Sequence, residues 1–203
     1  MRNVKTPSLA VLCSGNGTNL QALLEATTRG RLRATIAVVI SDRADAFALT
    51  RARRAGIPAQ VVERAHHESR AAFEGAIIRA CETHHVRLIC LAGFMRILSA
   101  HFVQRFPHRI LNIHPALLPA FPGGHAIRDA LTWGAKVTGV TVHFVDEHVD
   151  HGPIILQEPV AIYPRDTEAA LLARLHRVEH RLYPKAIDLV LSGRARVRGR
   201  RVL

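Results

Sequence analysis

Asn112 and His114 are the two residues of this 203-residue sequence whose types and spacing best suit catalysis. They lie two positions apart near the end of an apolar stretch typical of a strand, so their side chains project to the same side. An amide beside an imidazole suits acyl chemistry, because Asn can stabilise an oxyanion while His transfers a proton. A nearby carboxylate such as Asp150 would raise the imidazole pKa. The alternative is a histidine that only completes its hydrogen bonds at a strand end.

A glycine-rich turn, residues 14–19, connects the first apolar run to a helical pattern. Backbone N–H groups of such a turn and of the helix N-terminus favour a phosphate. The turn is not a Walker A loop, and Leu20 occupies the position of the third glycine in a GxGxxG motif. Asp42 could still act as the ribose-binding acid of a dinucleotide site. The alternative is a tight turn in which glycine supplies a positive φ.

Other residues with reactive side chains lie in sequence patterns that are less typical of a catalytic or binding site. There is no GxSxG motif, and Cys13 lies within an apolar run, which favours a core position over a nucleophile. The adjacent histidines 66–67 and 84–85 lack HxxxH or HExxH spacing, so we interpret them as surface residues. Arginines in residues 193–200 suit a nucleic-acid arm or a solvated edge strand. We favour the strand, because apolar residues alternate with these arginines.

Strand-like and helical stretches alternate along the chain, which predicts an α/β fold with a Rossmann-like open, mostly parallel sheet and helices on both faces. Seven strands are expected, at 9–13, 34–40, 57–62, 86–91, 109–113, 137–145 and 154–162. Helices are expected at 18–26, 45–55, 67–83 and 166–191, the last interrupted near Pro184. The last two strands are joined too briefly for a helical crossover, so they are expected to be antiparallel. No repeat or linker divides the chain, which predicts a single domain over residues 1–203.

Ligands of open α/β sheets bind beyond the carboxyl ends of the strands. The unusual loops of this sequence follow such ends, at residues 14–19, 93–96 and 112–115. In a parallel sheet these three loops share one rim. The loop at 146–153 reaches that rim only from a strand of opposite direction.

Composition narrows the class of protein. The sequence has no apolar run long enough for a membrane span and no signal-peptide pattern. Its three cysteines form no CxxC pair, which is typical of reduced thiols and predicts a cytoplasmic protein. A net charge of +12 favours an anionic partner: nucleic acid, a membrane surface or a small phosphorylated substrate. Aromatic residues make up only 5%, which leaves few stacking platforms for single-stranded nucleic acid.

Six segments, in this order and spacing, resemble the phosphoribosylglycinamide formyltransferase family, also called glycinamide ribonucleotide transformylases. They are SGNGTNLQALL, SDRADAFALTRARRAGIP, LAGFMRILS, LNIHPALLPAFPG, GVTVHFVDEHVDHGPIILQ and the Glu179-His180 stretch before Tyr183-Pro184. The resemblance covers roughly residues 8 to 200. It implies the formyltransferase fold, in which the sixth strand is antiparallel.

The resemblance also implies a reaction. The amine of 5'-phosphoribosylglycinamide attacks the formyl group of 10-formyltetrahydrofolate, a step of purine biosynthesis that gives formylglycinamide ribonucleotide and tetrahydrofolate. The folate is a co-substrate that carries the formyl group, so no metal is implied. Both partners are small molecules, with no nucleic acid and no membrane, and the protein is expected to be a monomer or homodimer.

Residue roles follow from the matching motifs. The implied catalytic residues are Asn112, His114 and Asp150, with Asp150 keeping His114 charged. The implied ribonucleotide-binding residues are Gly17, Thr18, Asn19 and Glu179. The implied folate-binding residues are Arg70, Met95, Arg96, Ile97, Leu98, Asn112, Asp146, Val149 and Asp150. The sequence departs from the family pattern at Ala120, where lysine is common, and at His151, where a small residue is common.

Three other classes of function remain as alternatives. Methionyl-tRNA formyltransferases and formyltetrahydrofolate hydrolases share the catalytic core but carry an extra domain, for which 203 residues leave no room. A dehydrogenase would use Gly15, Gly17 and Asp42 for NAD, and the missing third glycine argues against it. A basic RNA-binding module would leave Asn112, His114 and Asp150 without a role.

Overall fold

The computed structural model describes residues 6–203. These residues form two compact units, which divide between Ile110 and Leu111. The unit that ends at Ile110 contains the glycine-rich turn. The unit that begins at Leu111 contains Asn112, His114 and Asp150.

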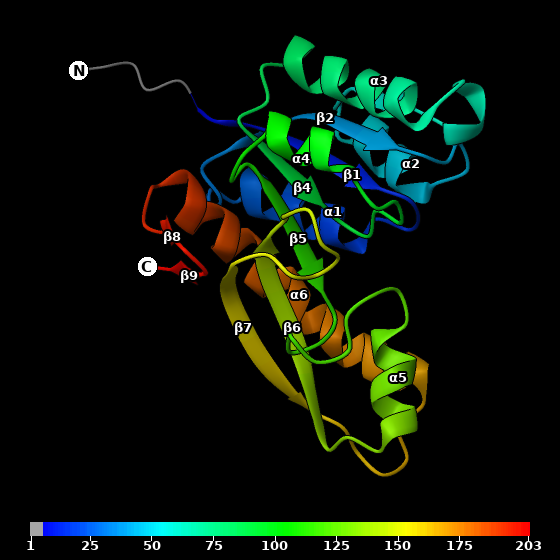
Figure 1. The fold of residues 1–203 in the computed structure, drawn as a ribbon, viewed down its shortest axis with the longest axis vertical. Coiled ribbons are helices and arrows are strands. Elements are labelled where there is room, and N and C mark those ends of the chain that lie inside the picture. Colours follow the sequence, from blue (N-terminus) through cyan, green and yellow to red (C-terminus); the bar gives the residue numbers. More distant parts are fainter. Residues whose placement is uncertain (1–5) are drawn as a thin grey trace. The chain divides into compact units, whose positions relative to one another are not determined.

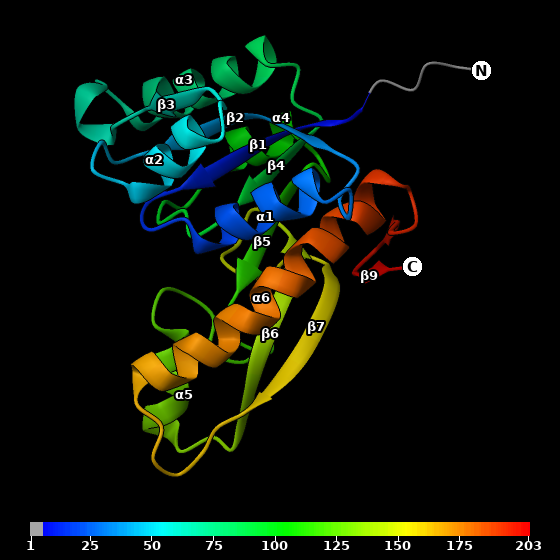
Figure 2. The same ribbon diagram turned by 180° about the vertical axis from the view of Figure 1, so that it is seen from behind.

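The first unit is a parallel sheet with helices on both faces. Its strands lie in the order β3-β2-β1-β4, and the pairs β1–β2, β1–β4 and β2–β3 are parallel. Helix α1 covers one face, nearest the viewer in Figure 2, and α4 covers the other, nearest the viewer in Figure 1. The elements are β1 (Ser8–Cys13), α1 (Thr18–Thr28), β2 (Thr35–Ser41), α2 (Phe47–Arg54), β3 (Ala59–Val61), a 3-10 turn (Arg64–His66), α3 (Arg70–Thr83), β4 (Leu88–Leu91) and α4 (Ala100–Arg105).

Strand β1 explains why this unit could be predicted from its sequence. Every residue from Leu9 to Cys13 is fully buried, because β1 lies between β2 and β4 and both of its faces are covered. A strand buried on both faces is a continuous apolar run rather than an alternating one. The same burial explains Cys13, whose thiol pKa is raised to about 12 by desolvation and then by the charge of Asp42. Cys13 is therefore a core residue, as predicted, and the Cys81 and Cys90 side chains are also buried.

The second unit is built on antiparallel strands. Strand β6 pairs with β5 and with β7, antiparallel in both cases, which confirms the expected opposite direction of the strand before the 146–153 loop. Helix α6 lies along β6 and β7, as Figure 2 shows. The elements are β5 (Ile110–His114), α5 (Ala126–Trp133), β6 (Val137–Phe144), β7 (Ile154–Ala161), α6 (Glu168–Leu191), β8 (Val197–Arg198) and β9 (Arg201–Val202).

One expectation about α6 is wrong. The helix runs unbroken from Glu168 to Leu191 and contains Pro184. Proline removes one backbone hydrogen bond from a helix interior. Pro184 and Tyr183 are buried where α6 packs on the strands, and the Tyr183 hydroxyl donates a hydrogen bond to the Leu111 carbonyl (3.1 Å). Packing of the apolar face therefore outweighs the missing bond.

The sequence analysis also missed the short helices α4 and α5, and it simplified the arginine-rich tail. The tail forms a two-stranded hairpin in which β8 pairs antiparallel with β9. Val197 faces Val202 in this pairing, and Arg198 faces Arg201. The strand interpretation was therefore correct in type, but the strands pair with each other. Within residues 6–203, no helix is long and apolar enough to cross a membrane.

Candidate active site

Asn112, His114 and Asp150 come together in the second unit. Asn112 and His114 lie on β5, and Asp150 lies in the loop between β6 and β7. The Asn112 amide donates a hydrogen bond to Asp150 Oδ1 (3.1 Å), and His114 Nδ1 lies 3.3 Å from Asp150 Oδ2. His114 is 4% exposed, so this imidazole–carboxylate pair is largely shielded from water. The spacing of Asn112 and His114 therefore allows both side chains to contact the Asp150 carboxylate.

The His114 ring faces an oxygen at each nitrogen. Its Nε2 lies 2.8 Å from the carbonyl oxygen of Phe121, and its Nδ1 faces Asp150. A carbonyl oxygen can only accept a hydrogen bond, so Nε2 carries a proton in this arrangement. Nε2 is therefore the atom from which a proton or a hydrogen bond could pass to a ligand.

The expected upward shift of the His114 pKa is wrong in its net direction. Burial disfavours the charged ring and lowers the pKa below its usual value near 6.5. The charge of Asp150 and the Phe121 carbonyl act in the expected upward direction, and His143 adds a small downward effect. Desolvation is the largest of these effects, so the net His114 pKa lies below its usual value. The sequence reasoning considered the carboxylate but not the cost of burial.

Asp150 is held by several donors. Burial raises the pKa of its carboxyl group, but at the acidic pH where a carboxyl titrates, hydrogen bonding from protonated His143, the charge of protonated His114 and the Gly123 amide outweigh burial, and the net pKa is lowered. The Gly123 amide donates to Asp150 Oδ2 at 2.8 Å. Asp150 also has a φ of 50°, which is rare and strained for a residue other than glycine. The loop thus holds an ionised carboxylate in a conformation that it would not adopt freely.

His143 is a site residue that the sequence analysis missed. It pairs with Asn112 across β5 and β6, and its Nε2 lies 3.2 Å from the Asn112 amide nitrogen and 3.6 Å from Asp150 Oδ1. Its Nδ1 lies 2.7 Å from the Phe144 carbonyl and therefore carries the proton, which leaves Nε2 free to accept from Asn112. A histidine in the otherwise apolar run VTGVTVHFV was the available signal.

Gly152 allows the loop that carries Asp150 to close. A Cβ atom at Gly152 would lie 1.8 Å from the carbonyl oxygen of Phe144, at the end of β6. No side chain fits at that distance, so the chain turns here only with glycine. This turn places Asp150 beside β5.

The glycine-rich turn of the first unit has a structural requirement of its own. Gly17 has a φ of 74° and directly precedes α1. A Cβ atom there would lie 2.7 Å from Ala48 Cβ on α2. Arg51, also on α2, donates hydrogen bonds to the carbonyl and side-chain oxygens of Asn16 (2.9 and 2.8 Å). The interpretation as a tight turn therefore holds for Gly17, and phosphate binding by Gly17, Thr18 and Asn19 stays a prediction.

We expect Gly17→Val to destabilise the protein by at least about 2 kcal/mol, because it combines a strained φ with overpacking against Ala48. Gly15→Ala is the matched control, since a Cβ atom at Gly15 meets nothing within 4 Å. Chemical denaturation of both variants measures the difference. Equal stability of Gly17→Val and the unmodified protein would refute the packing role of this glycine.

The implied folate residues of the first unit also lie together. Arg70 donates hydrogen bonds to Glu74 (3.0 Å) and to the Ile97 carbonyl (2.7 Å), and Glu74 accepts from the Ser99 amide (2.8 Å). Met95 and Ile97 remain exposed, whereas Leu98 is buried. The contacts of Arg70 thus hold a loop on which the Met95 and Ile97 side chains face solvent. Such an exposed apolar surface suits a flat apolar ligand.

Two further contacts connect this loop to the rest of the first unit. The Met95 amide donates to Ser14 Oγ (2.8 Å), so the loops at 14–19 and 93–96 do share one rim. Arg96 Nε donates to the buried Asp42 carboxylate (2.6 Å). Asp42 is therefore engaged by an arginine, which argues against a ribose-binding role. That the loop after β5 shares the same rim stays a prediction.

The remaining implied binding residues lie in the second unit. Glu179 is buried on α6, with one carboxylate oxygen 3.9 Å from His176 Nε2. Asp146 and Val149 lie in the same loop as Asp150, where Val149 is exposed. Asp146 accepts hydrogen bonds from the amide of His148 (3.0 Å) and from His151 Nδ1 (2.7 Å).

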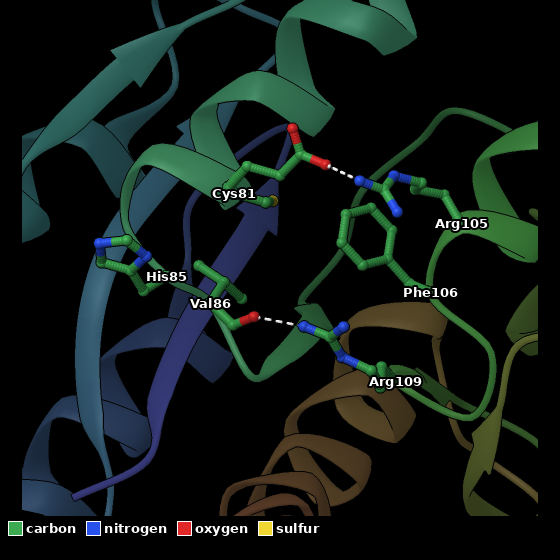
Figure 3. Close-up of a pocket in the computed structure, with 7 residues that line it drawn as sticks. Cys81, His85, Val86, Arg105, Phe106 and Arg109 are labelled. Carbon is green, nitrogen blue, oxygen red and sulfur yellow. Dashed lines mark hydrogen bonds and ion pairs between the residues drawn. The ribbon is translucent and has the colours of Figure 1, made fainter. Parts of the chain in front are cut away.

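A pocket of about 410 Å³ in the first unit contains none of the predicted site residues. Figure 3 shows that its charged groups are engaged: Arg105 pairs with Glu82, and Arg109 donates to the Val86 carbonyl. Burial raises the pKa of the Cys81 thiol in its wall to about 12, which makes it a poor nucleophile. The Cys81 thiol therefore gives this pocket no nucleophile.

The buried amide–imidazole–carboxylate cluster on an α/β scaffold points to acyl transfer, and comparison with known proteins defines the class. The chain belongs to the formyl transferase family, whose profile matches residues 8–187. Its relatives of similar length include phosphoribosylglycinamide formyltransferases. The enzyme of that name from Escherichia coli (strain K12) is 42% identical over 94% of this chain and 90% of its own length.

Two further relatives extend the comparison. The glycinamide ribonucleotide transformylase 1 structure from Symbiobacterium toebii superposes with a TM-score of 0.95 at 51% identity, covering 97% of this chain and 93% of that chain. This likeness and the strand pairings confirm the expected fold class, a mostly parallel seven-stranded α/β fold with one antiparallel late strand. The trifunctional purine biosynthetic protein adenosine-3 from Gallus gallus is 48% identical over 93% of this chain, which spans only 19% of that relative.

Proposed function

We propose that this protein transfers the formyl group of 10-formyltetrahydrofolate to the amine of 5'-phosphoribosylglycinamide, forming formylglycinamide ribonucleotide and tetrahydrofolate. The observation that carries the proposal is the buried cluster of Asn112, His114 and Asp150, on a chain that matches phosphoribosylglycinamide formyltransferases over nearly its full length. The proposal includes one formyltransferase domain over residues 1–203, a cytoplasmic location and a monomer or homodimer.

The reaction begins when the glycinamide amine attacks the formyl carbon and the carbonyl oxygen gains negative charge. In the unliganded protein, the Asn112 amide donates to Asp150 and His143, and His114 Nε2 donates to Phe121. The Asn112 N–H that donates to His143 and the Nε2–H of His114 turn to the oxyanion. Each of these donors thereby exchanges a neutral acceptor for a charged one. Hydrogen bonds to a charged group are about twice as strong as neutral ones. These donors therefore favour the tetrahedral intermediate over the bound substrate.

The protonation of His114 changes as the oxyanion forms. Burial lowers the pKa of the ring before the reaction, because the desolvation effect exceeds the attraction of Asp150. A second negative charge beside the ring favours the imidazolium form. His114 therefore takes up a proton from solvent while the intermediate forms, with Asp150 stabilising the charge at Nδ1, and it returns this proton when the oxyanion collapses to the carbonyl. Collapse of the intermediate then breaks the bond to folate N10, which receives the proton lost by the amine.

We assign the remaining residues to substrate binding. Backbone amides at Gly17, Thr18 and Asn19 bind the phosphate, and Glu179 binds the attacking amine. The loop of Met95, Arg96, Ile97 and Leu98, held by Arg70, binds the folate together with Asp146, Val149 and the catalytic residues. Both substrates are small molecules. The protein therefore needs no nucleic acid or membrane partner, and its reaction needs no metal.

A series of acceptors tests this assignment. We expect formyl transfer to 5'-phosphoribosylglycinamide, with KM rising at least about tenfold when the acceptor lacks the phosphate, because charge-assisted hydrogen bonds contribute about 1.5–3 kcal/mol each. Gly15→Val supplies a matched variant, since a Cβ atom there meets no protein atom within 4 Å. On this assignment the added side chain would obstruct the phosphate. Its KM should rise for the phosphorylated acceptor alone.

The same assay decides between this reaction and hydrolysis. Folate consumption that is equally fast with and without an acceptor would identify a hydrolase and overturn the proposal. An equal KM for phosphorylated and unphosphorylated acceptors would overturn the phosphate assignment.

A further inference from the structure

Three residues of the loop between β6 and β7 bring metal-type ligands together outside the catalytic cluster. Asp146, His148 and His151 each offer one ligand atom, and these atoms all lie within 4.8 Å of one another. The Asp146 carboxylate is half-buried, whereas both histidines are exposed. The candidate functions considered so far leave His148 and His151 without a role.

The loop already holds these side chains in a defined arrangement. One oxygen of Asp146 accepts a hydrogen bond from the His148 amide (3.0 Å), and the other lies 2.7 Å from His151 Nδ1. The two imidazole rings lie next to each other, with centroids 5.2 Å apart and planes tilted by 59°. Gly152 fixes the turn that follows, since no larger residue fits against the Phe144 carbonyl. Ligand side chains on such a constrained loop lose little conformational freedom when they bind an ion.

The surroundings of His151 also suit coordination. Its Nδ1 lies 2.7 Å from one oxygen of Asp146, so an ion that replaces the proton between them would contact both atoms. Arg200 Nη1 lies 3.2 Å from Nδ1 and 3.1 Å from Nε2, so a cation already lies against this ring.

We propose that Asp146, His148 and His151 form a binding site for a divalent transition-metal ion of the Zn²⁺ class. Two imidazoles and one carboxylate suit Zn²⁺ and exclude Ca²⁺ and Mg²⁺, which take oxygen ligands. The exposure of both histidines leaves the remaining coordination position to water. Arg200 also donates to the His151 carbonyl (2.6 Å), and it must turn away from the ring as the ion binds. Formyl transfer itself needs no metal. The site shares Asp146 with the proposed folate site, and a bound ion would hold the loop that carries Asp150.

Titration of the metal-free protein with Zn²⁺, followed by calorimetry, tests the proposal without any substrate. We expect one ion per chain. Replacing an outer partner of a metal site weakens binding by about 10–100-fold, so His148→Asn and His151→Gln, which remove a ligand, should each weaken it at least tenfold. The matched control is His176→Gln on α6, where His176 and His180 form another closely spaced pair of rings, 5.6 Å apart. It should bind Zn²⁺ as the unmodified protein does.

Arg200→Ala provides an independent test of the same geometry. Because the guanidinium competes for His151, its removal should tighten Zn²⁺ binding rather than weaken it. Circular dichroism confirms that each variant is folded. No Zn²⁺ binding by the unmodified protein would overturn the proposal, as would unchanged binding by both loop variants or loss of binding in His176→Gln. None of these results depends on whether the protein transfers formyl groups.

Discussion

Replacement of His114 by alanine is expected to lower kcat by about 10²–10⁴-fold, the range typical of a group that transfers a proton in the transition state. The imidazole is the side chain that both faces Asp150 and presents an N–H at its other nitrogen. Binding of the ribonucleotide should change little, because the phosphate is assigned to the first unit. Steady-state kinetics and calorimetry of the variant separate the two effects.

His101→Ala is the control for this experiment, since His101 is exposed on α4. Thermal unfolding shows whether removal of the buried His114 ring also reduces stability. A folded His114→Ala protein that binds the ribonucleotide and turns over at nearly the normal rate would rule out His114 as a catalytic residue.

Replacement of Asp150 by asparagine is expected to lower the His114 pKa further. Burial already lowers this pKa, and the Asp150 charge is the largest effect that opposes burial. Removing that charge makes the imidazolium harder to form, and each pKa unit corresponds to about 1.36 kcal/mol. Activity at neutral pH should fall at least about tenfold for each unit of the shift. NMR titration of His114 and the pH–rate profile measure the two quantities.

The direction of the pH effect follows from the same charges. Lower pH favours the imidazolium, so part of the lost activity should return in Asp150→Asn as pH falls, while the amine stays sufficiently deprotonated. Asp129→Asn on α5 is the matched control, because Asp129 lies half-buried beside Arg128 and outside the cluster. An unchanged His114 pKa in folded Asp150→Asn would contradict the electrostatic role of Asp150.

The proximity of Asn112, His114 and Asp150 could be predicted because local geometry determines part of it. Alternation along a strand places Asn112 and His114 on one side, and the short connection after residue 145 predicts the antiparallel return. His143 was missed because its partner is set by the register between β5 and β6, which one strand does not encode. The net pKa shift of His114 was missed for a related reason. It depends on how completely neighbouring segments exclude water from the ring.

Other differences have the same origin in tertiary packing. Pro184 breaks a local rule for helices, yet α6 continues because its apolar face is buried against β6 and β7. The ligand set of Asp146, His148 and His151 matches no familiar helical spacing, because a loop brings these side chains together. Gly17 was correctly placed in a turn, but its contact with Ala48 appears only once α1 and α2 are packed.

The fate of the formyl carbon tests the central claim most directly. The protein is supplied with 10-formyltetrahydrofolate carrying carbon-13 in the formyl group, together with 5'-phosphoribosylglycinamide, and the products are followed by NMR. We predict that the label appears in the amide of formylglycinamide ribonucleotide, and that His114→Ala slows its appearance by the same factor as kcat. Label that accumulates as formate, or that reaches the ribonucleotide equally fast in His114→Ala, would contradict the account.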